Sequence, residues 1–585
     1  MALSVFNTVP VAITTALYNL GQLYVRMNKD EDAATCFSRA LTFVQRWGVD
    51  NGNNCCKKSS SCGSGVSIIA ILHNLGHIQY RSGHYEESQR FYEQALTIGR
   101  RNNNNDGSNS SHCLLEIAST LNCMGILNFH IPGADPDMAM EFYMESLSIR
   151  RAVHGMDSEN IEIATTLNNV GRVHYLKGEH EQALDVYNET LQMRRRLLGD
   201  GHLDVAATAF NAGQTHHQLG NYTKAMNLFQ EFLDIAEKHL GAQHRDVAII
   251  LKCMAQIHHE RQQYDKAIDL YEKALSIGKN SLGQYHPEIA AILNKLGNLF
   301  YETKDLESAI RVYKQGLEIE QEILDDLHPN IVVTLTNIGQ IYKLRGGYKD
   351  ALRFHKEALA IQRRSLGRYH PNVSVTLSSI GLIQYQVGNY TLALDSYQEA
   401  LRVRREAYGD NHLDVAATLN SIGLVLLKME SHDFALDSLQ ESLNIRRNVL
   451  GPDHRDVATV LYNMATILLD VGGDDDAMTC YHETLRIERA VLGHSHKDII
   501  NTLLQIGLAH QQRGELDEAL KHLSEALEIQ KETGVTSNDS CIDIAQTLNQ
   551  MGNVFLQRGQ TEDVVSTLSD AVRYLAQAGK SVDDL

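Results

Sequence analysis

Residues 282–300 read LGQYHPEIAAILNKLGNLF, and a related stretch, LGRYHPNVSVTLSSIGLIQ, stands 84 residues later at 366–384. Half of that distance, 42 residues, is the period of the chain. The small residue that closes the pattern Leu-x-x-x-Gly returns at this interval from Gly171 to Gly507, twice as Ala. Because a period of about 20–50 residues indicates stacked supersecondary units, this spacing predicts a repeat architecture.

Thirteen units with this pattern cover residues 11–577, and the spacing is looser at both ends. Twelve residues after the small residue an Ala is usual, and sixteen after it an aromatic residue is common. Spacings of three, four and seven residues within each half of a unit are helical. The small residues are Gly21, Gly76, Gly125, Gly171, Gly213, Ala255, Gly297, Gly339, Gly381, Gly423, Ala465, Gly507 and Gly552.

Each unit is expected to form two antiparallel helices. A glycine between the two halves, as in Gly178-Glu179-His180 and Gly346-Gly347-Tyr348, supplies the left-handed residue that ends the first helix. One helix pair cannot bury its apolar face alone, so neighbouring pairs stack into a solenoid. The sequence therefore predicts an all-α fold, a right-handed α-solenoid of thirteen antiparallel helix pairs.

Two polar segments interrupt the period, and we predict that both are exposed loops. The first is rich in Asn, Ser and Cys, and the second contains four consecutive asparagines. The predicted solenoid spans residues 1–577. Its parts are repeat 1 at 11–47, an insert at 48–66, repeat 2 at 67–100, an insert at 101–112, repeat 3 at 113–152, repeats 4–12 at 153–534, repeat 13 at 535–577 and a polar tail at 578–585.

The repeat residues resemble the tetratricopeptide repeat, Leu-x-x-(Leu/Ile)-Gly-x-x-Tyr followed by Ala-x-x-x-(Phe/Tyr)-x-x-Ala-Leu. The 42-residue period and the Leu-Gly-x-x-His-Pro segments at 282–287 and 366–371 are similar to those of kinesin light chains and nephrocystin-3-like proteins. The resemblance implies a protein-interaction scaffold that binds an extended peptide or a helix in its concave groove. The alternative it implies is a cargo or transport adaptor with a motor or cytoskeletal partner.

A kinesin light chain also carries an N-terminal heptad coiled coil that joins it to the motor heavy chain. Here the first repeat begins at about Val11, which leaves no room for that segment. We therefore expect only the analogy with the cargo-binding groove to carry over.

The charge of the chain excludes several classes of partner. The 53 basic and 72 acidic side chains give a net charge of −19, which argues against nucleic acid and anionic membranes as partners. No stretch of about 20 apolar residues is present, so no membrane insertion is expected. The 9 cysteines are scattered and odd in number, which favours a reducing, cytoplasmic location. Cys55, Cys56 and Cys62 are interpreted as loop thiols, with a redox role as the alternative.

Eight histidines occupy one loop position of successive repeats. Proline follows three of them, at Pro287, Pro329 and Pro371, and proline favours the first turn of a helix. We therefore interpret these histidines as helix N-caps rather than as metal ligands. They are His202, His244, His286, His328, His370, His412, His454 and His496.

Two further pairs, His216-His217 and His258-His259, lie 42 residues apart and are expected side by side. Hydrogen bonding in the groove is the favoured role, and a zinc site with Glu260 as third ligand is the alternative. No phosphate loop, Ser/His/Asp order or paired-carboxylate motif is apparent. We therefore predict no enzyme, no metal and no cofactor, with an enzyme or enzyme regulator inside the superhelix as the remaining alternative.

The predicted peptide-binding groove consists of side chains on the first helix of each pair. Three positions face inward by family geometry: three residues before the small residue, one after it and four after it. In the central repeats these positions carry amides and rings, which can bind the backbone of an extended peptide. The predicted residues are Asn168, Arg172, Tyr175, Gln214, His217, Gln256, His259, Asn294, Asn298, Tyr301, Gln340, Lys343 and Tyr385.

The same positions become apolar in repeats 10–12, at Leu424, Leu427, Leu469 and Leu508. Two interpretations are open from the sequence. The leucines form a second contact surface, or a tight superhelix buries them.

Overall fold

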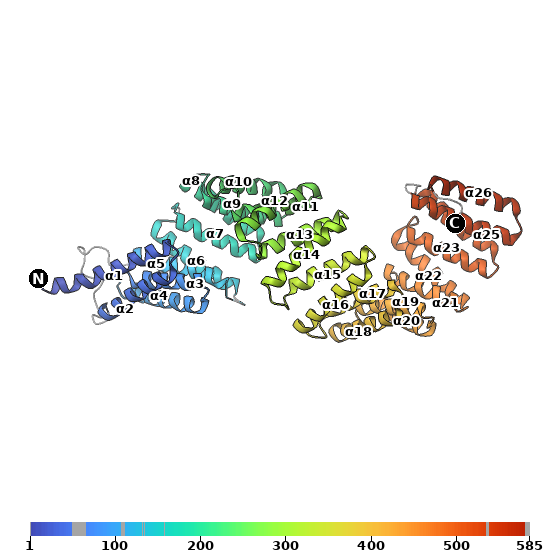
Figure 1. Ribbon diagram of the computed structural model, residues 1–585, viewed down its shortest axis with the longest axis horizontal. Helices are drawn as coiled ribbons and strands as arrows, with labels where there is room; N and C mark the ends of the chain where they lie inside the picture. Colours follow the sequence, from blue (N-terminus) through green and yellow to red (C-terminus); the bar gives the residue numbers. More distant parts are fainter. Residues whose placement is uncertain are drawn as a thin grey trace. The chain divides into compact units, whose positions relative to one another are not determined.

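The computed structural model describes residues 2–48, 66–106, 111–131, 133, 135–156, 158–533 and 538–579. These residues form helices and turns, and no strand occurs among them (Figure 1). The chain divides into two compact units, Met1–Gln284 and Tyr285–Leu585, which are considered one at a time.

Unit 1 contains six helix pairs, and the second helix of each pair packs on the first helix of the next. Its helices are α1 (Ala2–Arg26), α2 (Asp30–Gly48), α3 (Ile68–Arg81), α4 (Tyr85–Asp106), α5 (Ser111–Asn128), α6 (Pro136–His154), α7 (Ile161–Leu176), α8 (His180–Leu198), α9 (Leu203–Gln218), α10 (Tyr222–Leu240), α11 (Arg245–Glu260) and α12 (Tyr264–Leu282).

Unit 2 contains seven pairs that pack in the same way. Its helices are α13 (Pro287–Glu302), α14 (Leu306–Ile323), α15 (Pro329–Leu344), α16 (Tyr348–Ser365), α17 (Pro371–Val387), α18 (Tyr390–Tyr408), α19 (Leu413–Lys428), α20 (His432–Leu450), α21 (Arg455–Asp470), α22 (Asp474–Leu492), α23 (Lys497–Gln512), α24 (Leu516–Glu532), α25 (Asn538–Arg558) and α26 (Thr561–Gln577). The predicted thirteen helix pairs are therefore confirmed.

The small residue of each repeat allows the two helices of a pair to approach closely. A Cβ added to Gly171 would lie 2.7 Å from the ring of Tyr187, sixteen residues later. In unit 2, a Cβ on Gly297 would lie 2.6 Å from the ring of Tyr313. Both rings are buried, so the ring fills the space that the missing side chain leaves.

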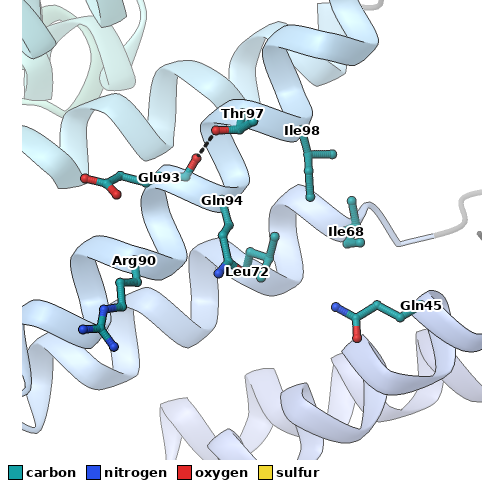
Figure 2. A pocket seen from close by; sticks show the side chains of 8 residues that line it. All are labelled: Gln45, Ile68, Leu72, Arg90, Glu93, Gln94, Thr97 and Ile98. Atoms are coloured by element: carbon teal, nitrogen blue, oxygen red, sulfur yellow. Dashed lines mark hydrogen bonds between the residues drawn. The ribbon is translucent and has the colours of Figure 1, made fainter.

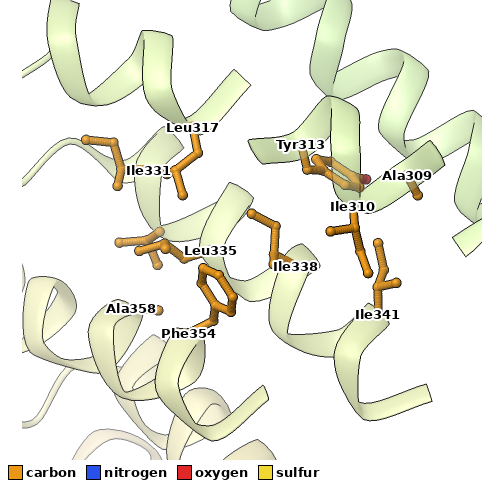
Figure 3. Close-up of a cluster of buried hydrophobic side chains, with 11 residues drawn as sticks. Ala309, Ile310, Tyr313, Leu317, Ile331, Leu335, Ile338, Ile341, Phe354 and Ala358 are labelled. Carbon is orange, nitrogen blue, oxygen red and sulfur yellow. The ribbon is translucent and has the colours of Figure 1, made fainter. Parts of the chain in front are cut away.

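Buried aliphatic side chains complete the core between pairs. In unit 2, Tyr313 and Leu317 of α14 meet Leu335 and Ile338 of α15, and Phe354 of α16 closes the cluster (Figure 3). These residues come from three consecutive helices, so the core continues from one pair to the next. No single pair encloses it, which is the packing expected of a solenoid.

The eight predicted histidine caps are confirmed. In each, the ring Nδ1 accepts a hydrogen bond from the backbone N–H two residues later, at 3.1–3.2 Å. Asn160 fills the same repeat position with the same kind of bond, and Ser67 caps the first helix of repeat 2 in the same way. The histidine series therefore satisfies helix ends.

Buried hydrogen bonds link neighbouring repeats, and the sequence analysis did not predict them. Arg194 donates to the backbone oxygen of Asp204 at 2.8 Å and to the Thr208 hydroxyl at 2.7 Å. In unit 2, the Thr376 hydroxyl donates to the Gln362 side chain at 2.8 Å. The available signal was the Thr that recurs five residues before the small residue.

The prediction of a loop over residues 101–112 is wrong for part of that segment. Helix α4 continues through the four asparagines to Asp106, and α5 begins at Ser111. Asparagine has a low helix propensity, but adding a residue to an existing helix costs far less than starting one. Cys55, Cys56, Cys62 and the other residues at 49–65 lie outside the described residues, as does the tail at 580–585.

The turn between the helices of a pair uses a left-handed residue, as predicted, and Gly178 has a φ of 78° there. Lys304 occupies the same turn position in repeat 7 with a φ of 63°. A left-handed conformation costs a residue with a Cβ about 1–2 kcal/mol. Lys304→Gly should therefore raise the free energy of unfolding by about 0.5–1 kcal/mol, after the greater chain entropy of glycine is subtracted. Urea denaturation followed by circular dichroism measures the change.

The matched control is the reverse substitution, Gly346→Lys, at the same turn position of repeat 8. It should shift the urea midpoint in the opposite direction. A midpoint that falls for Lys304→Gly would contradict the assignment of strain to this turn.

His355 occupies the aromatic position of repeat 8, is 1% exposed, and has neither ring nitrogen hydrogen-bonded within the described chain. Burial, with a smaller contribution from the Lys343 charge, lowers the pKa of His355 to about 4. The unfolded state binds this proton near pH 6.5, so stability is full above pH 6.5 and falls as pH drops towards 4. The full loss from this group is about 3 kcal/mol.

His355→Phe places at this position the residue that Phe229 supplies in repeat 5. Thermal melts between pH 7 and 4 should show a shallower loss of stability for the variant than for the wild type. Burial also lowers the pKa of His73 to about 4, so part of the slope stays in both proteins. Identical slopes would contradict the prediction.

Candidate peptide-binding site

The first helices form the more closely spaced row in both units. In unit 1, α7 contacts α9 and α9 contacts α11, with Cα atoms within 8 Å; in unit 2, α19 contacts α21 and α23 contacts α25 in the same way. The second helices of neighbouring pairs make no comparable contacts within the described chain. The shorter row lies on the inside of a curved stack. We call this side of each unit its inner surface.

Long charged side chains connect the second helices instead. In unit 1, Arg195 of α8 pairs with Glu231 of α10 at 2.6 Å. In unit 2, Arg405 of α18 pairs with Glu441 of α20, also at 2.6 Å. The same pairing recurs 36 residues apart at Arg363 with Glu399 and at Arg447 with Glu483. These side chains link second helices, which are less closely spaced than the first helices in the described repeats.

The predicted site residues fall into two sets. Asn168, Arg172 and Tyr175 lie on α7, Gln214 and His217 on α9, and Gln256 and His259 on α11, all in unit 1. Asn294, Asn298 and Tyr301 lie on α13, Gln340 and Lys343 on α15, and Tyr385 on α17, all in unit 2. None of the thirteen side chains is fully buried.

Glu260 is the centre of a polar network on the inner surface of unit 1. Its carboxylate accepts hydrogen bonds from His217 Nε2 at 2.8 Å and from Gln256 Nε2 at 3.1 Å. Partial burial raises the pKa of Glu260, but hydrogen bonds from His217, Gln256 and Tyr222 outweigh it, so the pKa is lowered. The sequence had indicated Glu260 only as a third zinc ligand.

Arg172 lies over the ring of Phe129 in the preceding repeat, with 5.2 Å from guanidinium to ring centroid. Burial raises the pKa of Tyr143 and of Tyr187, and the Arg172 charge opposes that rise. The guanidinium therefore lies near rings of two neighbouring repeats while its side chain is exposed.

Three of the predicted amides bind neighbouring side chains of the stack. In unit 1, Asn168 accepts a hydrogen bond from Asn211 of the next repeat at 3.2 Å. In unit 2, Asn294 donates to Glu320 at 2.8 Å, and Asn298 accepts from the Tyr313 hydroxyl. These contacts hold repeats and helices together, and they reduce what the three amides offer to a ligand.

The predicted rings pack against a second ring that the sequence analysis assigned only to a turn. His217 lies 6.0 Å from Tyr222, and Tyr175 lies 5.5 Å from His180, measured between ring centroids. In unit 2, Tyr385 lies 5.7 Å from Tyr390. The second ring begins the next helix, and the signal for it was the ring residue that closes the Gly-x-(Tyr/His) turn.

The four inner leucines of repeats 10–12 are partly buried. Leu427 packs against the core cluster around Leu443 and Val460, and Leu469 against the cluster around Leu485 and Ile506. Packing within the stack therefore accounts for these two leucines, as the second interpretation expected.

A surface pocket of about 480 Å³ lies away from the predicted residues (Figure 2). It is bordered by Gln45 of α2, Leu72 of α3 and Arg90 of α4, among others. Two of these three helices are second helices, so the pocket does not belong to the row that forms the inner surface.

Neither a cluster of metal-ligating side chains nor a membrane-spanning helix occurs among the described residues. No group of three or more His, Cys, Asp and Glu side chains is placed so that it could hold a metal ion, which leaves the zinc alternative without support. Within the same residues, no helix combines the length and the hydropathy needed to cross a bilayer.

The stacked helix pairs and their repeated small-residue contacts define an α-solenoid repeat protein. A tetratricopeptide repeat model matches residues 162–238, 246–322, 311–364, 330–406, 373–448, 414–487 and 456–532. Two further tetratricopeptide repeat models match residues 71–106 and 14–43. The chain belongs to the tetratricopeptide repeat family.

Solved structures with similar folds include repeat proteins of the kinesin light chain type. BtubC (BKLC) from P. vanneervenii is 17% identical, with a TM-score of 0.36, over 40% of this chain and 91% of that one. The kinesin light chain nearly identical TPR-like repeats of Podosopora anserina are 15% identical, with a TM-score of 0.32, over 35% of this chain and 97% of that one. No curated protein gives a significant match to the sequence.

Proposed function

We propose that the chain is a protein-interaction scaffold that binds an extended peptide segment of a partner on the inner surface of its first helices. The observation that carries the proposal is a pair of primary amides at one repeat position. Gln214 in unit 1 and Gln340 in unit 2 are partly exposed, and neither makes a hydrogen bond to another described residue. Each amide offers two donors and an acceptor, which match the groups of a peptide backbone.

The neighbouring rings support the same proposal. Tyr301 is 37% exposed, and Tyr175 and Tyr385 are partly exposed beside the rings of the following helix. Aromatic side chains give a large contact area with few rotatable bonds, so they lose little entropy when a ligand binds. Amides and rings together favour a ligand that is recognised by its backbone and shape.

The adaptor alternative, with a motor or cytoskeletal partner, rests on the resemblance to kinesin light chains. It differs from the general scaffold only in the identity of the partner. The enzyme alternative has no catalytic arrangement in its favour among the described residues. The six described cysteines form no disulfide bond with one another, which supports a reducing, cytoplasmic location as part of the proposal.

A double substitution of the unbonded amides tests the proposal. Gln214→Ala/Gln340→Ala should reduce recovery of specific partners from a cell lysate by about tenfold, since each hydrogen bond lost between neutral groups is worth about 0.5–1.5 kcal/mol. Quantitative mass spectrometry of the captured proteins measures the change. Recovery of a motor heavy chain by the wild type would select the adaptor alternative.

The matched control is Gln230→Ala/Gln440→Ala, which removes two exposed amides from the second helices α10 and α20. This variant should recover partners as the wild type does. Equal recovery by the wild type and both double variants, with unchanged circular dichroism, would refute peptide binding on the inner surface.

A further inference from the structure

We propose that the inner surface of unit 1 carries two subsites of opposite charge, at Arg172 and Glu260, which select a peptide segment with one acidic and one basic side chain. The inference rests on the proposed peptide-binding function and names the class of partner sequence.

Three contacts place the two charged residues on the same face. Arg172 lies over the ring of Phe129. Phe129 stands four residues after the small residue of repeat 3, and Arg172 stands one residue after the small residue of repeat 4. Tyr80 and His217 also stand four residues after the small residue of their repeats. Tyr80 forms a hydrogen bond of 2.8 Å with His130, and His217 forms one of 2.8 Å with Glu260. His130 and Glu260 each stand five residues after the small residue of the next repeat. Positions one, four and five residues after the small residue therefore share one face along unit 1.

Arg172 presents a cationic group that the fold does not neutralise. Within the described residues it forms no ion pair with a carboxylate, and its side chain is exposed. The cation–π contact with Phe129, with 5.2 Å from guanidinium carbon to ring centroid, restricts the position of the guanidinium without neutralising its charge. A planar guanidinium binds a carboxylate through two parallel hydrogen bonds. This subsite fits an Asp or Glu side chain.

Glu260 presents the opposite charge. Its three donors, from His217, Gln256 and Tyr222, orient the carboxylate, and no Lys or Arg of the described chain forms an ion pair with it. An imidazole, an amide and a phenol supply these hydrogen bonds without the permanent positive charge of a Lys or Arg. The side chain is 35% exposed, so a Lys or Arg of the ligand can reach it from solvent. The rings of His217 and Tyr222 beside it also favour a cation.

The spacing of the two subsites sets the spacing of the charges in the ligand. Arg172 lies on α7 and Glu260 on α11, with α9 between them. Packed helices lie about 8–10 Å apart, so two steps span about 16–20 Å. An extended peptide advances about 3.3 Å per residue, so the acidic and basic residues should stand about five or six residues apart. Gln214 of α9 then faces the backbone between them.

The test begins with a random library of 12-residue peptides displayed on phage and selected on the full wild-type chain. Enriched peptides are expected to contain an acidic and a basic residue about five or six positions apart. Synthetic copies, labelled with a fluorophore, are then measured by fluorescence polarisation. Neutralising either charged residue of the peptide should weaken binding to the wild type about tenfold.

Single variants assign each charge. Arg172→Gln should lose the preference for the acidic residue and keep that for the basic one, and Glu260→Gln should do the reverse. The doubly exchanged chain, Arg172→Glu/Glu260→Arg, should bind the peptide whose two charges are exchanged. The control Glu237→Gln/Lys238→Gln alters an exposed acid and base on the second helix α10 and should leave both preferences unchanged.

The outcomes separate the two proposals. Selection that yields no binding peptide overturns both. Peptides that bind and depend on Gln214, but whose charge preferences are unchanged in Arg172→Gln and Glu260→Gln, overturn the charged subsites and leave the proposed function standing. Circular dichroism of each variant confirms that a lost preference does not come from unfolding.

Discussion

The contact between a small residue on one helix and a ring or a leucine on its partner governs the packing of the helix pairs. In repeat 4, Gly171 and Tyr187 fix how closely α7 and α8 approach, because a Cβ at 2.7 Å would displace the ring. A contact of the same kind recurs at the other glycines of this position, with a ring at Gly213 and Gly297 and with a leucine at Gly423 and Gly507, and it aligns the first helix of a pair with the second. Positions counted from the small residue therefore have the same surroundings in successive repeats. The inner surface follows from this, since residues one, four and five positions later always emerge on one side.

The part of the structure that depends on backbone geometry could be predicted from the sequence. The period, the histidine N-caps such as His286, and the left-handed turns such as Gly178 each follow from a local rule. Contacts between repeats could not be predicted in the same way. The hydrogen bond from His217 to Glu260 depends on two side-chain conformations in different repeats, and the period does not determine either. The prediction placed the asparagines before Asp106 in a loop because of their polar composition, although they continue the helix that precedes them.

The interfaces between repeats differ more than the helix pairs do. Arg194 binds a backbone oxygen and a threonine, while Gln362 accepts from a threonine alone, and Glu488 accepts from Thr502 at 2.8 Å. Burial raises the pKa of Glu488 and lowers that of Arg194. A buried polar group needs its own partner, so exchanging one such residue without the other leaves a group unsatisfied. The polar residues on the two sides of each interface are therefore matched to one another, although the helices that carry them are nearly alike from repeat to repeat.

The difference between the two rows of helices has a mechanical consequence. Neighbouring first helices such as α7 and α9 have Cα atoms within 8 Å of one another, so their row is closely packed. The second helices are linked across exposed ion pairs such as Arg195 with Glu231, whose long side chains can lengthen or shorten by rotating. We therefore expect each unit to bend by changing the distances between its second helices more than the distances between its first helices. Salt screens exposed ion pairs, so a higher ionic strength weakens these links between the second helices.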